Sequence, residues 1–175
     1  MRMRSGPRKF VLSLHLIVSI GWIGAVAAYL ALDVSTITSD DPGILRAAYA
    51  GMDLIVQTVI VPLAVATLVT GIVISLGTRW GLFRHYWVVI SLLLTVVATA
   101  VLVSETRTVS ALAGIAADPS TTPEELSALN STLVHSVGGL LVLIAILTLN
   151  VYKPRGMTPY GWRKQSGGVG QNTSG

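Results

Sequence analysis

Few side chains within or beside the apolar stretches of this chain could do chemistry, and the first group of candidates contains two histidines and a tryptophan. His15 lies near the start of the first apolar stretch, Trp22 follows seven residues later, and His85 precedes the third stretch. An imidazole nitrogen can ligate a metal or a haem iron, and it can also carry a proton. We therefore treat His15, Trp22 and His85 as candidate cofactor-binding residues.

A second group combines His135 with the carboxylates of Asp53 and Glu105, which lie near the opposite ends of their apolar stretches. One imidazole and two carboxylates could bind a transition metal such as copper, or exchange protons. His15 and His135 fall in opposite leaflets, so they cannot both ligate one iron. The alternative is structural: the acids are solvated helix ends, His15 bonds a neighbouring helix, and His85 belongs to an aromatic belt.

Several kinds of chemistry are excluded by what the sequence lacks. The chain has no cysteine, so it has no disulfide, no thiolate metal site and no cysteine nucleophile. It also contains no phosphate-binding loop, nucleophile elbow or HExxH motif. Enzyme activity is therefore not indicated, and we expect a protein that is not a catalyst.

The elements that must position these side chains are apolar helices. Of the 175 residues 52% are hydrophobic and only 11% are charged, with a mean hydropathy of +0.71, whereas a soluble domain carries roughly 25% charged residues. Four stretches can cross a bilayer, each with about 20 apolar residues: 10–32, 54–77, 86–103 and 133–151. The sequence predicts an all-α protein in which residues 1–165 form a single four-transmembrane-helix bundle and residues 166–175 form a disordered cytoplasmic tail.

The charged residues divide between the two sides of this predicted bundle. The segments before the first span, between the second and third, and after the fourth hold ten of the twelve basic residues and no acid. The two other connections hold all eight acids and only Arg46 and Arg107 as bases. By the positive-inside rule both termini are cytoplasmic. A competing interpretation is a cleaved signal peptide ending at residues 25–27, but the apolar run continues past that site for a full span.

Helix start and stop signals predict that helices 2 to 4 extend beyond the membrane on the outer side. Thr122, Pro123 and Glu125 form a capping-box pattern, so we expect one continuous fourth helix from Pro123 to Tyr152. The spacing of apolar residues after each outer boundary predicts a helical hairpin that turns at residues 118–121. Pro62 should kink the second helix, and Asp41-Pro42 should start it.

The first helix carries most of its polar residues on one face. At 100° per residue the side chains that share this face are His15, Ser19, Trp22, Val26, Tyr29 and Asp33. Polar side chains are costly against lipid, so this face should point into the bundle. The hydroxyl side chains of the other helices would then act mainly as hydrogen-bonding contacts between helices.

The spacing of His15, Trp22 and Gly24 resembles the first helix of copper-resistance-D-like and protoporphyrinogen-oxidase-J-like membrane proteins. In the latter a comparable histidine is linked to haem, so the resemblance implies haem b or copper as a cofactor and His15 as a ligand. The oxidase-type families carry a lysine in the third helix, and the third span here has none. Residues 150–165, NVYKPRGMTPYGWRKQ, resemble the ending of uncharacterised actinobacterial integral membrane proteins.

Three functional hypotheses follow. The first is an accessory or interaction subunit in the cytoplasmic membrane of a bacterium, with the lipid bilayer and a homodimer or larger membrane complex as its partners. The second is a b-type haem or copper redox protein that uses His15 or His135. The third is proton-coupled transport of a small solute by an oligomer. A nucleic-acid partner is not expected, because the basic residues are divided by topology and form no binding face.

Overall fold

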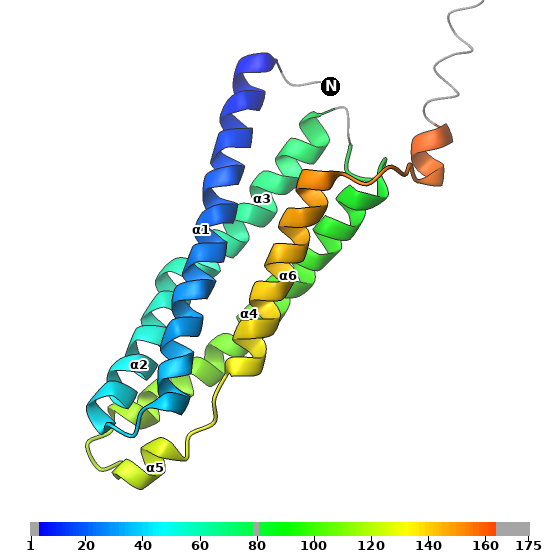
Figure 1. The fold of residues 1–175 in the computed structure, drawn as a ribbon. Helices are drawn as coiled ribbons and strands as arrows, with labels where there is room; N and C mark the ends of the chain where they lie inside the picture. The colour runs from blue at the N-terminus through cyan, green and yellow to red at the C-terminus, as the bar shows by residue number, and fades with distance from the viewer. Residues whose placement is uncertain (1–3, 79–80, 164–175) are drawn as a thin grey trace, which may run out of the picture.

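The computed structural model describes residues 4–78 and 81–163, and the long elements in these ranges are all helices (Figure 1). The elements are α1 (Ser5–Thr38), α2 (Pro42–Ile55), the π-helical turn η1 (Val56–Ile60), α3 (Val61–Gly77), α4 (Tyr86–Ala117), α5 (Pro123–Ser127) and α6 (Leu133–Tyr152). Because α2, η1 and α3 form one run, the described residues contain four helices long and apolar enough to cross a membrane. The predicted all-helical fold with four long apolar helices is confirmed, whereas the predicted tail lies outside the described residues.

The four long helices form a ring in which each contacts two neighbours. α1 packs against α2 and α3 on one side and against α6 on the other, and α4 makes the same two contacts from the opposite corner. Figure 1 shows that α1 and α4 begin, and α3 and α6 end, at one end of the bundle, which we call the terminal end. The α1–α2 and α4–α5 connections lie at the other end, the distal end.

Apolar side chains cover the outside of the bundle as well as its core. Ile17 on α1, Leu54 on α2, Leu93 on α4 and Leu141 on α6 are each more than 60% exposed. Apolar patches of this extent are rare on water-soluble monomers. Lipid contact explains them, in agreement with the hydropathy of the sequence.

Two clusters of buried apolar residues hold the helices together. The central cluster is built from α1, α2, η1, α3, α4 and α6 around Trp22, Met52 and Leu143. The distal cluster joins α2, α4 and α5 and consists of Leu45, Tyr49, Leu112, Ala116 and Leu126. The distal cluster keeps the α4–α5 hairpin against the start of α2.

The second helix is distorted next to Pro62, as the sequence predicts. Pro62 has no N–H to bond the carbonyl of Thr58, and its ring would crowd that carbonyl in an α-helix. The structure places the π-helical turn Val56–Ile60 directly before it. A π-helical turn shifts the hydrogen-bond register by one residue and so accommodates the proline.

The predicted caps at Asp41 and Thr122 are confirmed. The Asp41 carboxylate accepts a hydrogen bond of 2.7 Å from the backbone N–H of Gly43. Thr122 and Glu125 form the reciprocal capping box at the start of α5. Each cap satisfies N–H groups that have no partner within their helix.

The prediction of one continuous helix from Pro123 to Tyr152 is wrong, because α5 ends at Ser127 and α6 begins at Leu133. Leu126 is buried in the distal cluster, whereas the hydroxyls of Ser131 and Thr132 bond a carboxylate of α1. The Ser131 hydroxyl also accepts the backbone N–H of Leu133. Such side-chain bonds compete with helix formation, and here they hold the chain in an irregular connection.

After α6 the chain folds back over the α3–α4 connection. The backbone N–H of Thr158 donates to the carbonyl of Arg84 over 3.0 Å, and its hydroxyl donates to the carbonyl of Phe83. Gly161 packs so closely that an added Cβ would lie 2.5 Å from the Arg84 carbonyl oxygen. A residue without a side chain is therefore required at this contact.

Candidate functional site

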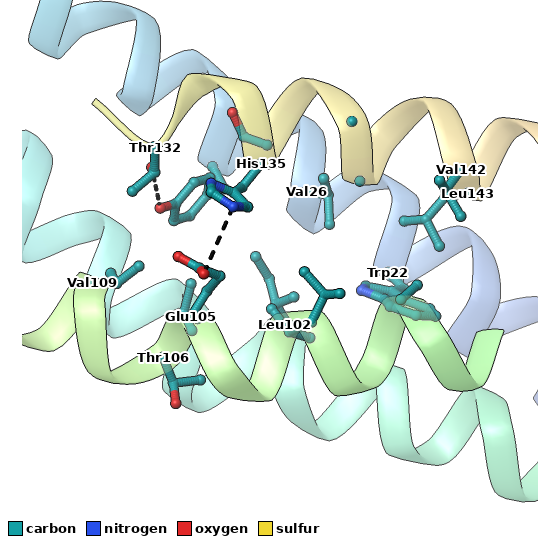
Figure 2. A pocket seen from close by; sticks show the side chains of 18 of the residues that line it. Trp22, Val26, Leu102, Glu105, Thr106, Val109, Thr132, His135, Val142 and Leu143 are labelled. Carbon is teal, nitrogen blue, oxygen red and sulfur yellow. Dashed lines mark hydrogen bonds and ion pairs between the residues drawn. The ribbon is translucent and has the colours of Figure 1, made fainter. Parts of the chain in front are cut away.

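The first candidate site is a cavity of about 290 Å³ between α4 and α6, with α1 and η1 forming its remaining wall (Figure 2). We call it the α4–α6 cavity. Its lining is mostly apolar and includes Val26, Val56, Ile60, Leu102, Val109 and Val142. Small-molecule sites are usually apolar clefts with a few polar groups, and their volumes start at about 300 Å³. This cavity is therefore large enough only for a small ligand.

One end of the α4–α6 cavity carries an ionisable pair. Nε2 of His135 on α6 lies 3.7 Å from a carboxylate oxygen of Glu105 on α4, and Figure 2 shows the two side chains pointing toward one another across the cavity. The His135 side chain is 54% exposed and that of Glu105 is 29% exposed. The pair is therefore accessible, and its strength depends on protonation of the imidazole.

The opposite end of the α4–α6 cavity is closed by Trp22. This residue is only 3% exposed, and its indole N–H has no hydrogen-bond partner. Figure 2 shows the indole nitrogen on the edge of the ring that points along the cavity toward Leu102. An unsatisfied buried donor costs roughly 1–3 kcal/mol. A ligand with an acceptor atom would recover that cost.

The Asp33 carboxylate is fully buried and accepts three side-chain hydrogen bonds. One carboxylate oxygen accepts from the hydroxyls of Thr132 at 3.0 Å and Ser136 at 2.8 Å, and the other accepts from Ser131 at 3.2 Å. The Tyr29 hydroxyl lies 2.7 Å from that of Thr132. These bonds join α1 to the start of α6.

The direction of these bonds follows from counting protons. The single hydroxyl proton of Thr132 is used in its bond to Asp33. Tyr29 must therefore donate to Thr132, which gives the chain Tyr29 to Thr132 to Asp33. Tyr29 and Thr132 also line the α4–α6 cavity, so this network fixes one wall of the cavity.

The three residues predicted to bind a metal do not meet at one point. Glu105 and His135 are brought together, whereas Asp53 accepts a 2.6 Å hydrogen bond from Ser110, whose hydroxyl in turn accepts from Gln57. In the part of the chain that the structure describes, no group of three or more His, Asp or Glu side chains could hold a metal ion. Metal binding at His135, Asp53 and Glu105 stays a prediction.

A second cavity, of about 1090 Å³, occupies the terminal half of the bundle and is lined by α1, α3, α4 and α6. We call it the basic cavity, because the ionisable residues that line it are Arg8, Lys9, His15 and Lys153. Trp22 and Leu143 line both cavities. These two side chains therefore form the partition between them.

His15 is held by a hydrogen bond from α1 to α3. Its Nδ1 lies 2.9 Å from the hydroxyl oxygen of Thr70, and that hydroxyl also lies 2.6 Å from the carbonyl of Ala66. The Thr70 proton is used in the bond to Ala66, so Nδ1 of His15 must be the donor to Thr70. In neutral His15 this tautomer leaves the lone pair of Nε2 available.

His85, the third residue predicted to bind a cofactor, stands directly before α4. Its backbone forms an antiparallel bridge with Met157, and it occupies the N-cap position of α4 without a capping hydrogen bond from its side chain. Trp22 and His15 share the basic cavity, whereas His85 is not among its lining residues. His85 therefore belongs to the contact between the α3–α4 connection and the C-terminal segment.

Two residues that organise the distal end were not singled out as candidates in the sequence. Asp33 falls on the polar face of helix one, four residues after Tyr29, and this spacing was the available signal. Arg46 donates to the carbonyls of Ala116, Asp118 and Thr121. No sequence pattern indicates those bonds, because they connect residues 70 to 75 positions apart.

Comparison with known proteins gives no relative: no family model, no curated protein and no solved structure matches this chain.

Proposed function

We propose that this protein is an accessory protein of the bacterial cytoplasmic membrane, with both termini cytoplasmic, that binds a small apolar molecule in the α4–α6 cavity. The topology rests on the distribution of charge, since ten basic residues and no acid fall in the three segments assigned to the cytoplasm. The terminal end would then face the cytoplasm. The bilayer is the source of the ligand.

The observation that carries the proposal is the pairing of an apolar cavity with an unsatisfied donor. Trp22 is almost completely buried, yet its N–H has no partner, and it lies at the end of the cavity opposite Glu105 and His135 (Figure 2). Buried donors without partners are rare in folded proteins. The ligand would therefore be apolar along its length and carry a hydrogen-bond acceptor at the Trp22 end.

The ligand should also tolerate or use the pair at the other end. A second polar atom, at the end of the ligand far from Trp22, could accept a hydrogen bond from the imidazole of His135 or donate one to Glu105. A small, largely apolar molecule with a carbonyl oxygen supplies the acceptor for Trp22. Menadione, an apolar compound with two such carbonyls, is a suitable probe of this chemistry.

The test compares two glycine substitutions in the membrane helices. A Cβ added at Gly139, which lines the α4–α6 cavity, or at Gly24, which does not, meets no atom within 4 Å. Gly139→Leu should fill cavity space and weaken menadione binding by about tenfold or more. Gly24→Leu should leave binding unchanged. The measurement is quenching of tryptophan emission in lipid nanodiscs, corrected with empty nanodiscs.

Equal binding by both variants, or binding no stronger than partition into empty nanodiscs, would reject the proposed site. Native mass spectrometry of the protein taken directly from membranes extends the test to the natural ligand. A bound mass retained by Gly24→Leu and lost from Gly139→Leu would identify it.

A second candidate function, binding of haem or copper, is supported by the tautomer of His15. Its Nε2 is left as an acceptor, and its Nδ1 is fixed by Thr70, as is usual for a histidine that ligates a metal. This candidate predicts a Soret band, or copper in elemental analysis, that is lost in His15→Ala. A colourless, metal-free preparation from haem-replete cells would reject it.

A further inference from the structure

The basic cavity has a distribution of charge that the proposed function does not use. Each ionisable side chain on its wall is basic or a histidine: Arg8 and Lys9 at the start of α1, His15 one to two turns further along, and Lys153 just after α6. Among the described residues that line it, none is an aspartate or glutamate. The electrostatic potential inside such a cavity is positive, and it favours an anion.

The remainder of the wall is apolar and continues deep into the bundle. Leu12, Leu16 and Ile20 on α1 and Ile146, Leu147 and Val151 on α6 are among the residues that line it. With a volume of about 1090 Å³, the space lies at the upper end of the range for small-molecule sites. A free inorganic anion would leave most of this apolar surface uncovered. An amphiphile with an anionic head and a long apolar tail would cover it.

We infer that the basic cavity binds one anionic phospholipid, with the phosphate held by Arg8, Lys9 and Lys153 and an acyl chain lying along the apolar wall toward Trp22. The ammonium group of lysine and the guanidinium group of arginine are the side-chain groups that bind phosphate oxygens. Arg8 and Lys9 come from the start of α1, whereas Lys153 follows α6 and is far from them in sequence. Their common cavity therefore distinguishes this site from a general attraction of basic loops to anionic lipid.

Two triple variants with the same change in charge test this inference. Arg8→Gln/Lys9→Gln/Lys153→Gln neutralises the cavity, whereas Arg4→Gln/Arg155→Gln/Arg163→Gln neutralises three bases that do not line it. Both proteins are purified from mixed phosphatidylglycerol and phosphatidylethanolamine, and the lipid retained is counted by native mass spectrometry. The cavity variant should lose phosphatidylglycerol by about fivefold or more, and the control by less than about twofold.

A single substitution tests the same site if the triple variant does not fold. Arg8 lies in the first turn of α1, where an acidic side chain favours the helix. Arg8→Glu should therefore fold as the parent does, and it should still lose phosphatidylglycerol by about threefold or more. His15 and Trp22 are unchanged in every variant, so the result is independent of ligand binding in the α4–α6 cavity.

Three outcomes would overturn the inference. If the cavity and control variants lose equal amounts of phosphatidylglycerol, the bases act only by surface attraction. If neither the cavity variant nor folded Arg8→Glu loses phosphatidylglycerol, these bases bind no lipid. Inorganic phosphate provides the third arm: displacement of phosphatidylglycerol by millimolar phosphate, together with phosphate binding to delipidated protein, would assign the cavity to a free anion.

Discussion

The two ends of the bundle differ in how their polar groups are satisfied. At the distal end Asp33 receives three hydroxyl hydrogen bonds, and Arg46 donates to three backbone carbonyls. In the half nearer the terminal end, Ser19, Trp22, Thr67 and Thr78 each hold a buried polar atom without a partner. All four of these residues line the basic cavity.

The difference separates a distal end that is fixed by side-chain hydrogen bonds from a terminal half that surrounds the basic cavity. Side-chain bonds between helices fix the distal end, where α4, α5 and the start of α2 also share an apolar cluster. The terminal half has its helices around a large cavity, and its interhelical bonds include that of His15 with Thr70. Substitutions at the distal end should therefore reduce stability, whereas substitutions near Trp22 should change binding.

The largest expected effect is on Asp33. Asp33→Ala leaves three hydroxyls without their acceptor and opens a void, and it should lower the free energy of unfolding by about 3 kcal/mol. Asp33→Asn keeps an oxygen for two of those donors and should cost roughly 1 kcal/mol. Unfolding in SDS followed by circular dichroism measures both. Asp40→Ala, at an exposed position, is the control, and an equal effect there would contradict the assignment.

The second effect concerns Arg46. Arg46→Ala removes the donors to the carbonyls of Ala116, Asp118 and Thr121, and should destabilise the protein by about 1–2 kcal/mol. Arg46→Lys keeps the charge but cannot reach all three carbonyls, so it should recover only part of the loss. The same SDS titration reports the result. Arg107→Ala, on the exposed surface of α4, should change stability by less than about 0.5 kcal/mol.

Trp22→Phe should change ligand binding much more than stability. The substitution removes an unsatisfied N–H and should change the free energy of unfolding by less than about 1 kcal/mol. Menadione binding should nevertheless weaken by about tenfold, since the ligand loses its donor. Trp162→Phe is the control, as Trp162 lines neither cavity. A large loss of stability with unchanged binding would show that Trp22 is only a packing residue.

The smallest effect is a pH dependence at the α4–α5 turn. Hydrogen bonds from the hydroxyl and backbone N–H of Ser120, with a smaller contribution from Arg46, hold the pKa of Asp118 below its usual value of 3.8. Because the folded pKa is lowered, the stabilisation is complete above pH 3.8 and is lost as the pH falls through the folded pKa. Ser120→Ala should raise the pKa of Asp118 in a carboxyl carbon NMR titration. An unchanged pKa would contradict the role of Ser120.

The features that the sequence predicted correctly are those set by neighbouring residues. The four apolar helices follow from composition, and the caps at Asp41 and Thr122 follow from residues within one turn of each start. The distortion before Pro62 is local in the same way. Such features need no knowledge of how the helices pack.

The features that the sequence did not predict depend on contacts between distant residues. The spacing of Leu126, Leu129 and Leu133 favours a continuous helix, but the bonds from Ser131 and Thr132 to Asp33 cross about 100 residues and break it. Helix packing also brings Glu105 close to His135, whereas Asp53 accepts a hydrogen bond from Ser110. Periodicity identifies a polar face, but only packing decides which partners meet.

The NMR signal of the Trp22 indole N–H shows whether a ligand accepts a hydrogen bond from it. Protein labelled with ¹⁵N-tryptophan in nanodiscs gives indole signals, and the one lost in Trp22→Phe is that of Trp22. Added menadione should move this signal downfield, because the N–H gains an acceptor, and should leave the Trp162 signal in place. Saturable menadione binding with an unmoved Trp22 signal would contradict the account.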